Sequence, residues 1–280
     1  MTITKALITA ANPADKHLPL QTIVDSNGET KTALAILLEE LLDANITTIA
    51  IVIAPGEASN FKQAAGQHAS QLTFIEQLEP LGYGHAVASA ADFIDNESFL
   101  LLVGDHLFRS FSQKSCIQQL LDLAEKEDAT ISGVQPTHEA HLQLYGTVAA
   151  QLIPGSKGIY DVSSIIEKPT PTLAEQELIV PGLRAGYYLC FFGMHALPGS
   201  AMGHLHDRLN NLPLGEKMGL TPTLNHLASS GKYLALQIDG QRYNLGERYG
   251  LLRAQLALGL AGPHRDEVMA TLIELLATDR

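Results

Sequence analysis

The chain has 280 residues, of which 46% are hydrophobic, so it can bury the core of one large α/β domain or of two small ones. Its 30 acidic and 18 basic residues give a formal net charge of −12, which argues against nucleic acids and anionic membranes as partners. Two cysteines provide neither a disulfide framework nor a zinc site, and the apolar runs are too short to span a bilayer. These features predict a soluble protein of the cytoplasm.

The first half of the chain alternates between strand and helix patterns. Residues 32–44 repeat leucine at helical spacing, whereas residues 99–103 form a continuous apolar run, typical of a strand buried on both faces. The alternation indicates βαβ units and a mainly parallel sheet. Further strands are predicted at residues 6–11, 46–54, 72–75 and 130–134, and further helices at 82–94 and 116–126.

After about residue 140 the strand-like stretches follow one another with few helices between them. They read "YGTVAA", "VSSIIEKP" and "LRAGYYLCFF", and they predict an inserted, more antiparallel region. Helices are expected at 220–229 and 250–258, a strand at 233–238, and a final amphipathic helix over 264–277. We therefore expect one domain over residues 1–262, followed by a helical appendage over 263–280.

The turn after the first strand raises a question about phosphate binding. An early strand of an α/β chain commonly runs into a ligand-binding turn, and turns that hold phosphate are normally rich in glycine. Here the turn reads Asn12-Pro13-Ala14-Asp15-Lys16 and contains no glycine. Its position suits a phosphate loop, but its composition does not.

The stretch "LLLVGDHLF" is the strongest local indication of a ligand-binding site. A buried strand ends there and places Gly104 and Asp105 at the carboxyl edge of the sheet, where open α/β sheets bind their ligands. A carboxylate at this edge suits Mg²⁺, which takes hard oxygen ligands and phosphates as partners. The alternative is that Asp105 only caps a turn.

Two further motifs are weak when taken alone. "GYGHAV" opens a helix on glycine, so its amides suit a base or a phosphate, although Gly82 and Gly84 equally suit close packing. "IIEKP" places Glu167 and Lys168 at a strand end, where adjacent side chains point to opposite faces. The carboxylate suits sugar hydroxyls and the ammonium suits a phosphate, but an exposed ion pair would give the same sequence.

The order of these motifs is more specific than any one of them. The first strand and its loop, "GYGHAV", "LVGDHLF", "YGTV", "IIEKP", "RAGYYL", "LTPTLNHL" and "RYNLGERYGLLRA" follow one another up to about Gly259. This order resembles the sugar-phosphate nucleotidyltransferases, most closely the bacterial UTP–glucose-1-phosphate uridylyltransferases. The resemblance implies a Rossmann-like mixed sheet of the nucleotide-diphospho-sugar transferase type with an inserted antiparallel sugar-binding region. It also implies a homo-oligomer.

The same resemblance implies an activity and a set of site residues. A nucleoside triphosphate, UTP, would react with a sugar 1-phosphate, glucose 1-phosphate, and yield UDP-glucose and pyrophosphate with Mg²⁺ as cofactor. The nucleotide would meet Ala10, Ala11, Asn12, Gln77, Gly82 and Gly104, and the glucose Gly146, Glu167 and Gly186. Lys168 would bind the sugar phosphate, Lys16 would replace a catalytic arginine, and Asp105 and Asn244 would hold the metal.

Two positions depart from the pattern of this family. The loop at residues 12–16 has lost both of the family's glycines and carries Asp15 where the triphosphate would lie. Asn244 stands where the family has an aspartate, and a neutral amide is a weaker ligand for a hard cation. These departures keep two alternatives open, namely a non-catalytic relative that binds a sugar nucleotide or sugar phosphate, and a nucleotidyltransferase for another base or sugar.

Overall fold

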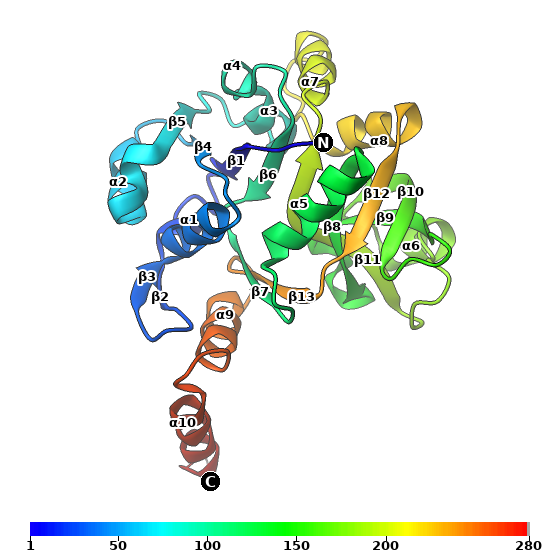
Figure 1. Cartoon of the computed structure of the whole chain (residues 1–280). Helices are drawn as coiled ribbons and strands as arrows, with labels where there is room; N and C mark the ends of the chain where they lie inside the picture. Colours follow the sequence, from blue (N-terminus) through cyan, green and yellow to red (C-terminus); the bar gives the residue numbers. More distant parts are fainter. Residues whose placement is uncertain (279–280) are drawn as a thin grey trace.

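A nine-stranded sheet forms the centre of the molecule, and Figure 1 shows helices on both of its faces. The computed structural model describes residues 1–278. The strand order is β5-β4-β1-β6-β11-β8-β12-β10-β9. The strands are β1 (Lys5–Ala10), β4 (Thr48–Ile53), β5 (Leu72–Glu76), β6 (Phe99–Val103), β8 (Thr130–His138), β9 (Gly146–Leu152), β10 (Ile159–Glu167), β11 (Tyr187–Leu197) and β12 (Tyr233–Gln237).

The sheet is mixed, as the fold class implied by the resemblance requires. β5, β4, β1 and β6 are parallel neighbours, which confirms the pattern expected for the first half of the chain. β11 then runs antiparallel to both β6 and β8, and β10 runs antiparallel to β12 and β9. The second half of the chain thus supplies the antiparallel region, and the sheet as a whole is not mainly parallel.

Two helical layers bury the two faces of the sheet. Ala6, Ile8 and Ala10 of β1 pack against one layer, and Leu7 faces the other, because side chains alternate along a strand. The first layer contains α1 (Ala33–Asp43), α2 (Ala58–Ala65) and α5 (Cys116–Glu127). The second contains α3 (Tyr83–Ala88), α4 (Ala91–Ile94), α7 (Ala201–Asn210) and α8 (Thr221–Ser230).

Local sequence signals explain several of these elements. The hydroxyls of Thr32 and Ser115 each accept a hydrogen bond from a backbone amide three residues on, and so fix where α1 and α5 begin. The prediction of one continuous helix over residues 82–94 is wrong, because this range contains two helices, α3 and α4. The helix breaks at Ser89, whose hydroxyl bonds to the carbonyl of His85, and Ala90 leaves the helical backbone conformation.

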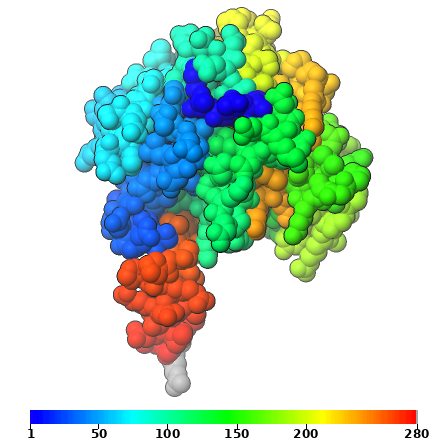
Figure 2. Space-filling view, in the orientation of Figure 1, coloured from blue at the N-terminus to red at the C-terminus, as the bar shows by residue number. Residues whose placement is uncertain are grey.

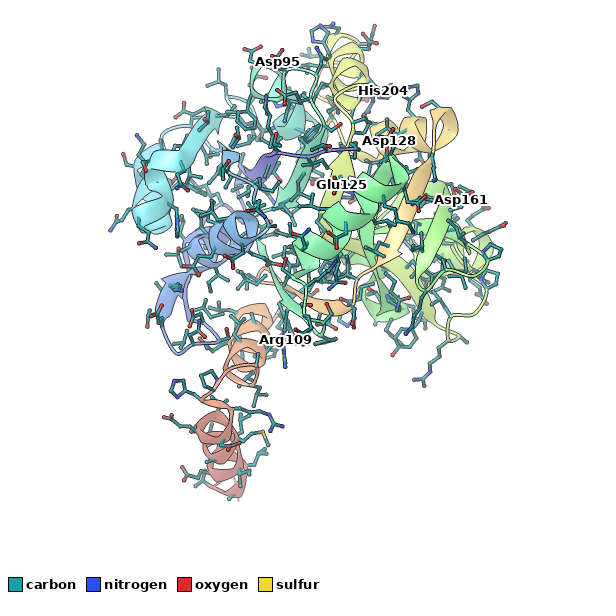
Figure 3. The ribbon with its side chains drawn as sticks, viewed as in Figure 1. Asp95, Arg109, Glu125, Asp128, Asp161 and His204 are labelled. Carbon is teal, nitrogen blue, oxygen red and sulfur yellow. The ribbon has the colours of Figure 1, made fainter. Side chains whose placement is uncertain are left out.

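Two small sheets flank the main sheet. β2 (Thr22–Val24) and β3 (Thr30–Thr32) form a hairpin around Gly28, whose φ is +87°. β7 (His106–Ser110) pairs with β13 (Gly240–Asn244) next to α9 (Gly250–Gly259), in the part of Figure 3 that labels Arg109. The remaining elements are α6 (Pro171–Glu177) and the short 3₁₀ helices η1 (Leu18–Leu20), η2 (Gly66–Gln71) and η3 (Glu139–Leu144).

The last helix, α10 (Arg265–Thr278), projects away from the rest of the molecule, as Figures 1 and 2 show. None of its described residues is buried, and Ile273, Leu275 and Leu276 are exposed. The domain boundary at residue 262 stays a prediction, and residues 279 and 280 of the expected appendage lie outside the described chain. Within residues 1–278, no helix is both long and apolar enough to cross a membrane.

Candidate active site

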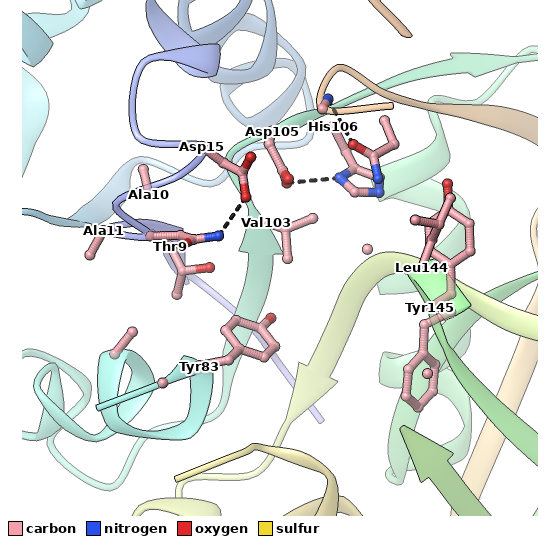
Figure 4. A pocket seen from close by; sticks show the side chains of 18 of the residues that line it. Thr9, Ala10, Ala11, Asp15, Tyr83, Val103, Asp105, His106, Leu144 and Tyr145 are labelled. Atoms are coloured by element: carbon pink, nitrogen blue, oxygen red, sulfur yellow. Dashed lines mark hydrogen bonds and ion pairs between the residues drawn. The ribbon is translucent and has the colours of Figure 1, made fainter. Parts of the chain in front are cut away.

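A cleft of about 740 Å³ opens where β1, β6 and β10 end (Figure 4). Residues far apart in the sequence meet in this cleft. Open α/β sheets bind their ligands at this edge, where the strands end. Ten of the thirteen predicted site residues line it: Ala10, Ala11, Asn12, Gln77, Gly82, Asp105, Gly146, Glu167, Lys168 and Asn244. The other three also belong to the described chain but do not line the cleft: Lys16, Gly104 and Gly186.

The loop at residues 12–16 presents a carboxylate to the cleft. The carbonyl of Asn12 accepts hydrogen bonds from the amides of Asp15 (3.0 Å) and Lys16 (2.8 Å), which closes a tight turn without glycine. The amide of Asn12 also donates to the Asp15 carboxylate. Lys16 Nζ turns to Glu57 Oε1 at 2.5 Å. The loop therefore does not place the Lys16 ammonium where the missing arginine's charge was expected.

Asp105 lies at the centre of the cleft, between the end of β6 and the start of β7. Its Oδ1 lies 2.9 Å from His106 Nδ1. Burial raises the pKa of this carboxyl, but the neighbouring His106 imidazole, together with a backbone hydrogen bond and the Lys168 ammonium, holds the pKa below its ordinary value. Asp105 is therefore ionised at neutral pH. Gly104 has a packing role, since its amide bonds to the carbonyl of Thr9 at 2.9 Å.

Asn244 reaches the same place from β13. It is the register partner of His106, and the amide of Leu245 bonds to the carbonyl of Asp105 at 2.9 Å. A Cβ on Gly246 would lie 3.2 Å from Asn244 Oδ1 and 3.5 Å from Asp15 Oδ1. Figure 4 shows Asp15 and Asp105 facing the same part of the cavity. The absent side chain of Gly246 thus leaves room for the Asn244 amide and the Asp15 carboxylate.

Gln77 stabilises, through hydrogen bonds, the wall of the cleft that is assigned to the base. Its buried amide nitrogen donates to the carbonyl of Gly82 (3.1 Å) and approaches His85 Nδ1 at 2.8 Å. Gly82 has a φ of +113°, and a Cβ there would lie 2.8 Å from the carbonyl oxygen of Met218. This position therefore requires glycine for two independent reasons. The backbone of "GYGHAV" is fixed against the cleft.

The wall assigned to the sugar is built from β9 and β10. A Cβ on Gly146 would lie 2.7 Å from Cδ2 of Phe191 and 3.0 Å from Glu167 Oε2, so the glycine leaves room for the carboxylate. Glu167 also accepts a hydrogen bond from the hydroxyl of Thr221 at 2.9 Å. Lys168 follows the end of β10 with a φ of +48°, so strand alternation no longer applies and both side chains line the cleft.

Sequence reasoning missed several polar groups of the cleft. Tyr83 and Tyr145 lie in motifs that were singled out for their glycines, although both line the cavity. The hydroxyl of Tyr83 is buried and has no hydrogen-bond partner of good geometry within residues 1–278. Glu247, which accepts a hydrogen bond from the Tyr145 hydroxyl, comes from a segment 102 positions further along the chain.

His195 also lines the cleft, from β11. Its Nδ1 lies 2.6 Å from the hydroxyl of Ser132, which lies 2.6 Å from that of Tyr233. Burial lowers the pKa of His195 from 6.5 to about 4, so the imidazole is neutral at pH 7. The signal that could have found it was a histidine within an apolar strand, two residues after Gly193.

Other candidate groups have structural roles. Cys116 is fully buried, and burial raises the pKa of its thiol, which suits a core residue rather than a nucleophile. Within residues 1–278, no three His, Cys, Asp or Glu side chains lie close enough together to hold a metal ion by themselves. A metal in this cleft would therefore depend on ligands from the substrate as well.

The chain is similar to known proteins over much of its length. The family model described as nucleotidyl transferase matches residues 23–192. The chain is 27% identical to the UTP–glucose-1-phosphate uridylyltransferase YngB of Bacillus subtilis, over 98% of this chain and 96% of that protein. It is 26% identical to the UTP–glucose-1-phosphate uridylyltransferase of Streptococcus pneumoniae, over the same shares.

Solved structures share the fold. A UDP-glucose pyrophosphorylase from Acinetobacter baumannii gives a TM-score of 0.76 at 23% identity, over 98% of this chain and all of that one. A UDP-glucose pyrophosphorylase solved with UDP-glucose gives a TM-score of 0.74 at 22% identity, over 91% and 98% of the two chains. Since the family model spans more than half of its length, the chain belongs to the nucleotidyl transferase family.

Proposed function

We propose that this protein transfers the uridylyl group of UTP to glucose 1-phosphate, yielding UDP-glucose and pyrophosphate. One observation carries the proposal: a single cleft joins the wall of Gln77 and Gly82 to the wall of Glu167 and Lys168, with Asp105 between them. The names of the relatives from Bacillus subtilis and Streptococcus pneumoniae support the same substrates.

The proposed reaction is an in-line displacement at phosphorus. An oxygen of the sugar phosphate attacks the α-phosphorus of UTP, a new P–O bond forms, and the bond to the β-phosphate breaks to release pyrophosphate. Lys168 would hold the attacking phosphate, while the Glu167 carboxylate would accept hydrogen bonds from glucose hydroxyls. Gln77 and Gly82 would orient the uracil. Catalysis of this kind depends on positioning and charge neutralisation.

The residues of the cleft fit a bound Mg²⁺ that shares its ligands with the substrate. Asp105 supplies an ionised carboxylate and Asn244 an amide oxygen, while Asp15 adds a second carboxylate nearby. Mg²⁺ in phosphate-transfer sites is held by one or two carboxylates together with substrate phosphates and water. When bound, the ion would neutralise the charge of the phosphates. Asn244 Oδ1 already accepts a hydrogen bond from Gly246 at 2.9 Å, so it would be a weak ligand.

The loop at residues 12–16 favours a second candidate function. Lys16 is engaged by Glu57, and Asp15 adds a negative charge where a triphosphate would lie. A protein that binds UDP-glucose or glucose 1-phosphate without turnover would keep the sugar wall and could lose the triphosphate loop. In that case its role would be regulation or assembly.

Pyrophosphate release separates these functions. The protein is assayed with Mg²⁺ against a panel of nucleoside triphosphates and sugar 1-phosphates. Turnover restricted to UTP and glucose 1-phosphate supports the proposal, whereas turnover with another pair reassigns the base or the sugar. A folded protein that binds UDP-glucose in calorimetry but turns over no pair is the binding relative.

We also propose that the protein acts in the cytoplasm as a homo-oligomer. Both cysteines are free and buried, which suits a reducing compartment.

The proposed homo-oligomer is supported by the exposed apolar side chains of α10. They include Ile273 and Leu276, which are 60% and 78% exposed. Light scattering after size exclusion tests the oligomer, and a single protomer mass would contradict it.

A further inference from the structure

A second, smaller cavity of about 150 Å³ lies against the main cleft. Tyr145, Asn244 and Glu247 line both cavities, so they form the wall between them. Arg242 and Arg253 line only the smaller one. Neither arginine has a role in the reaction proposed above.

Arg242 carries a buried charge with unused hydrogen-bond donors. The residue is only 5% exposed, and its guanidinium lies over the ring of Tyr145, 3.7 Å from the ring centroid. Its Nη2 donates to the hydroxyl of Thr137 at 3.0 Å. Its Nε and Nη1 are buried and have no hydrogen-bond partner within residues 1–278. An arginine stays protonated in proteins, so this is a buried cation whose donors are only partly satisfied.

Within residues 1–278, Arg242 forms no ion pair with the nearby carboxylate. Among the residues that line this cavity, all of them described, Glu247 is the one acidic residue. Its Oε1 accepts from the hydroxyl of Tyr145, and its Oε2 accepts from Arg253 Nη1 at 3.2 Å. Both oxygens are thus engaged elsewhere. The two arginines and the single carboxylate leave the cavity with one positive charge in excess.

We propose that this cavity is a binding site for a small tetrahedral oxyanion of the phosphate class. Its volume, about 150 Å³ against about 740 Å³ for the main cleft, suits a single phosphate group rather than a nucleotide. Arg242 retains unpartnered charged N–H donors at Nε and Nη1, the kind of donor that phosphate oxygens accept. Arg253 and the imidazole of His141, which also lines the cavity, provide further donors.

The inference does not rest on the proposed enzymatic function, because it can be tested with orthophosphate alone. Calorimetric titration of the full-length protein with sodium orthophosphate, at constant ionic strength and without nucleotide, is the direct measurement. We expect one phosphate per chain. Arg242→Met and Arg253→Gln should each weaken binding about tenfold or more, because each removes charge-assisted hydrogen bonds.

Two control variants, together with Arg253→Gln, make the result specific. Arg253→Gln changes a side chain that is 55% exposed, so it stays informative if Arg242→Met does not fold. Arg265→Gln removes an exposed arginine from α10 and should leave the affinity within about twofold, as expected for a distant surface charge. Lys168→Ala removes a cation that lines the main cleft and not the smaller cavity, so it should leave the phosphate affinity that depends on Arg242 and Arg253 unchanged.

Three results would overturn the proposal. The first is an absence of orthophosphate binding to the parent protein at millimolar concentration. The second is an affinity that neither Arg253→Gln nor a folded Arg242→Met alters. The third is an affinity lost in Lys168→Ala, because the phosphate would then sit in the main cleft.

Discussion

Lys16 Nζ lies 2.5 Å from Glu57 Oε1, and this ion pair directs the lysine away from the cleft that its loop borders. Lys16→Ala should therefore lower kcat/KM for UTP by less than about tenfold, whereas loss of a donor that acts in the transition state typically costs about 100-fold or more. Steady-state pyrophosphate release measures the difference. Glu57→Gln is the matched variant, since it frees the ammonium and should not lower activity. A loss of about 100-fold in Lys16→Ala would show that Lys16 leaves Glu57 during turnover.

Lys168 is expected to be far more important than Lys16. Lys168 lines the cleft. Lys168→Ala should therefore reduce kcat by about 100-fold or more, because the charge of the phosphates would no longer be neutralised there. Lys168 has a φ of +48°, and alanine and arginine carry a Cβ as lysine does, so neither variant changes the backbone strain there. Lys168→Arg retains the charge and should recover part of the activity. Equal losses in both variants would contradict a role that depends on the positive charge.

Gly146 should tolerate no side chain. A Cβ there would lie 2.7 Å from the Phe191 ring, so Gly146→Ala should destabilise the fold by about 1–3 kcal/mol and weaken UDP-glucose binding by displacing Glu167. Chemical denaturation and calorimetry measure the two effects. Gly203→Ala is the control, since no atom lies within 4 Å of its Cβ position in α7 and the change should be neutral or stabilising. Wild-type values for Gly146→Ala would contradict the packing described.

Much of this arrangement could be predicted from the sequence, and some of it could not. The apolar run at residues 99–103 and the leucine repeat of α1 depend on local periodicity, which the sequence displays directly. Gly82, Gly146, Asp105 and Glu167 of the cleft could be predicted because they lie within ordered motifs. The pairing of Lys16 with Glu57 joins residues 41 positions apart, and no local pattern encodes it. The left-handed backbone at Lys168 likewise depends on its contact with Tyr145, whose carbonyl accepts the Lys168 amide at 3.2 Å.

His195 should make stability depend on pH. The folded protein holds its pKa near 4, below 6.5, so the unfolded chain binds more protons between these values. Stability from this group is therefore present above about pH 6.5 and falls by up to about 1.4 kcal/mol per pH unit towards pH 4. Urea denaturation of His195→Gln should show a flatter pH dependence in this window. His264→Gln, an exposed control, should behave like the parent. Parallel curves for parent and His195→Gln would contradict the account.

Asn244 should limit the affinity for Mg²⁺. Restoring a carboxylate in Asn244→Asp adds a charged oxygen ligand beside Asp105, so calorimetry should show tighter Mg²⁺ binding in the presence of UTP. Asn210→Asp introduces the same charge at an exposed position of α7 and should change nothing. Identical Mg²⁺ affinities for the parent and Asn244→Asp would show that residue 244 does not contact the metal.

The central claim is that one cleft, with Asp105 at its centre, joins UTP to glucose 1-phosphate. The most direct measurement is the amount of UDP-glucose formed from these two substrates and Mg²⁺ by the parent protein and by a folded Asp105→Asn variant, which removes the ionised carboxylate with little change in shape. We expect steady product formation by the parent and a loss of about 100-fold or more in the variant. No product from a folded parent that binds UDP-glucose, or equal product from both proteins, would contradict the account.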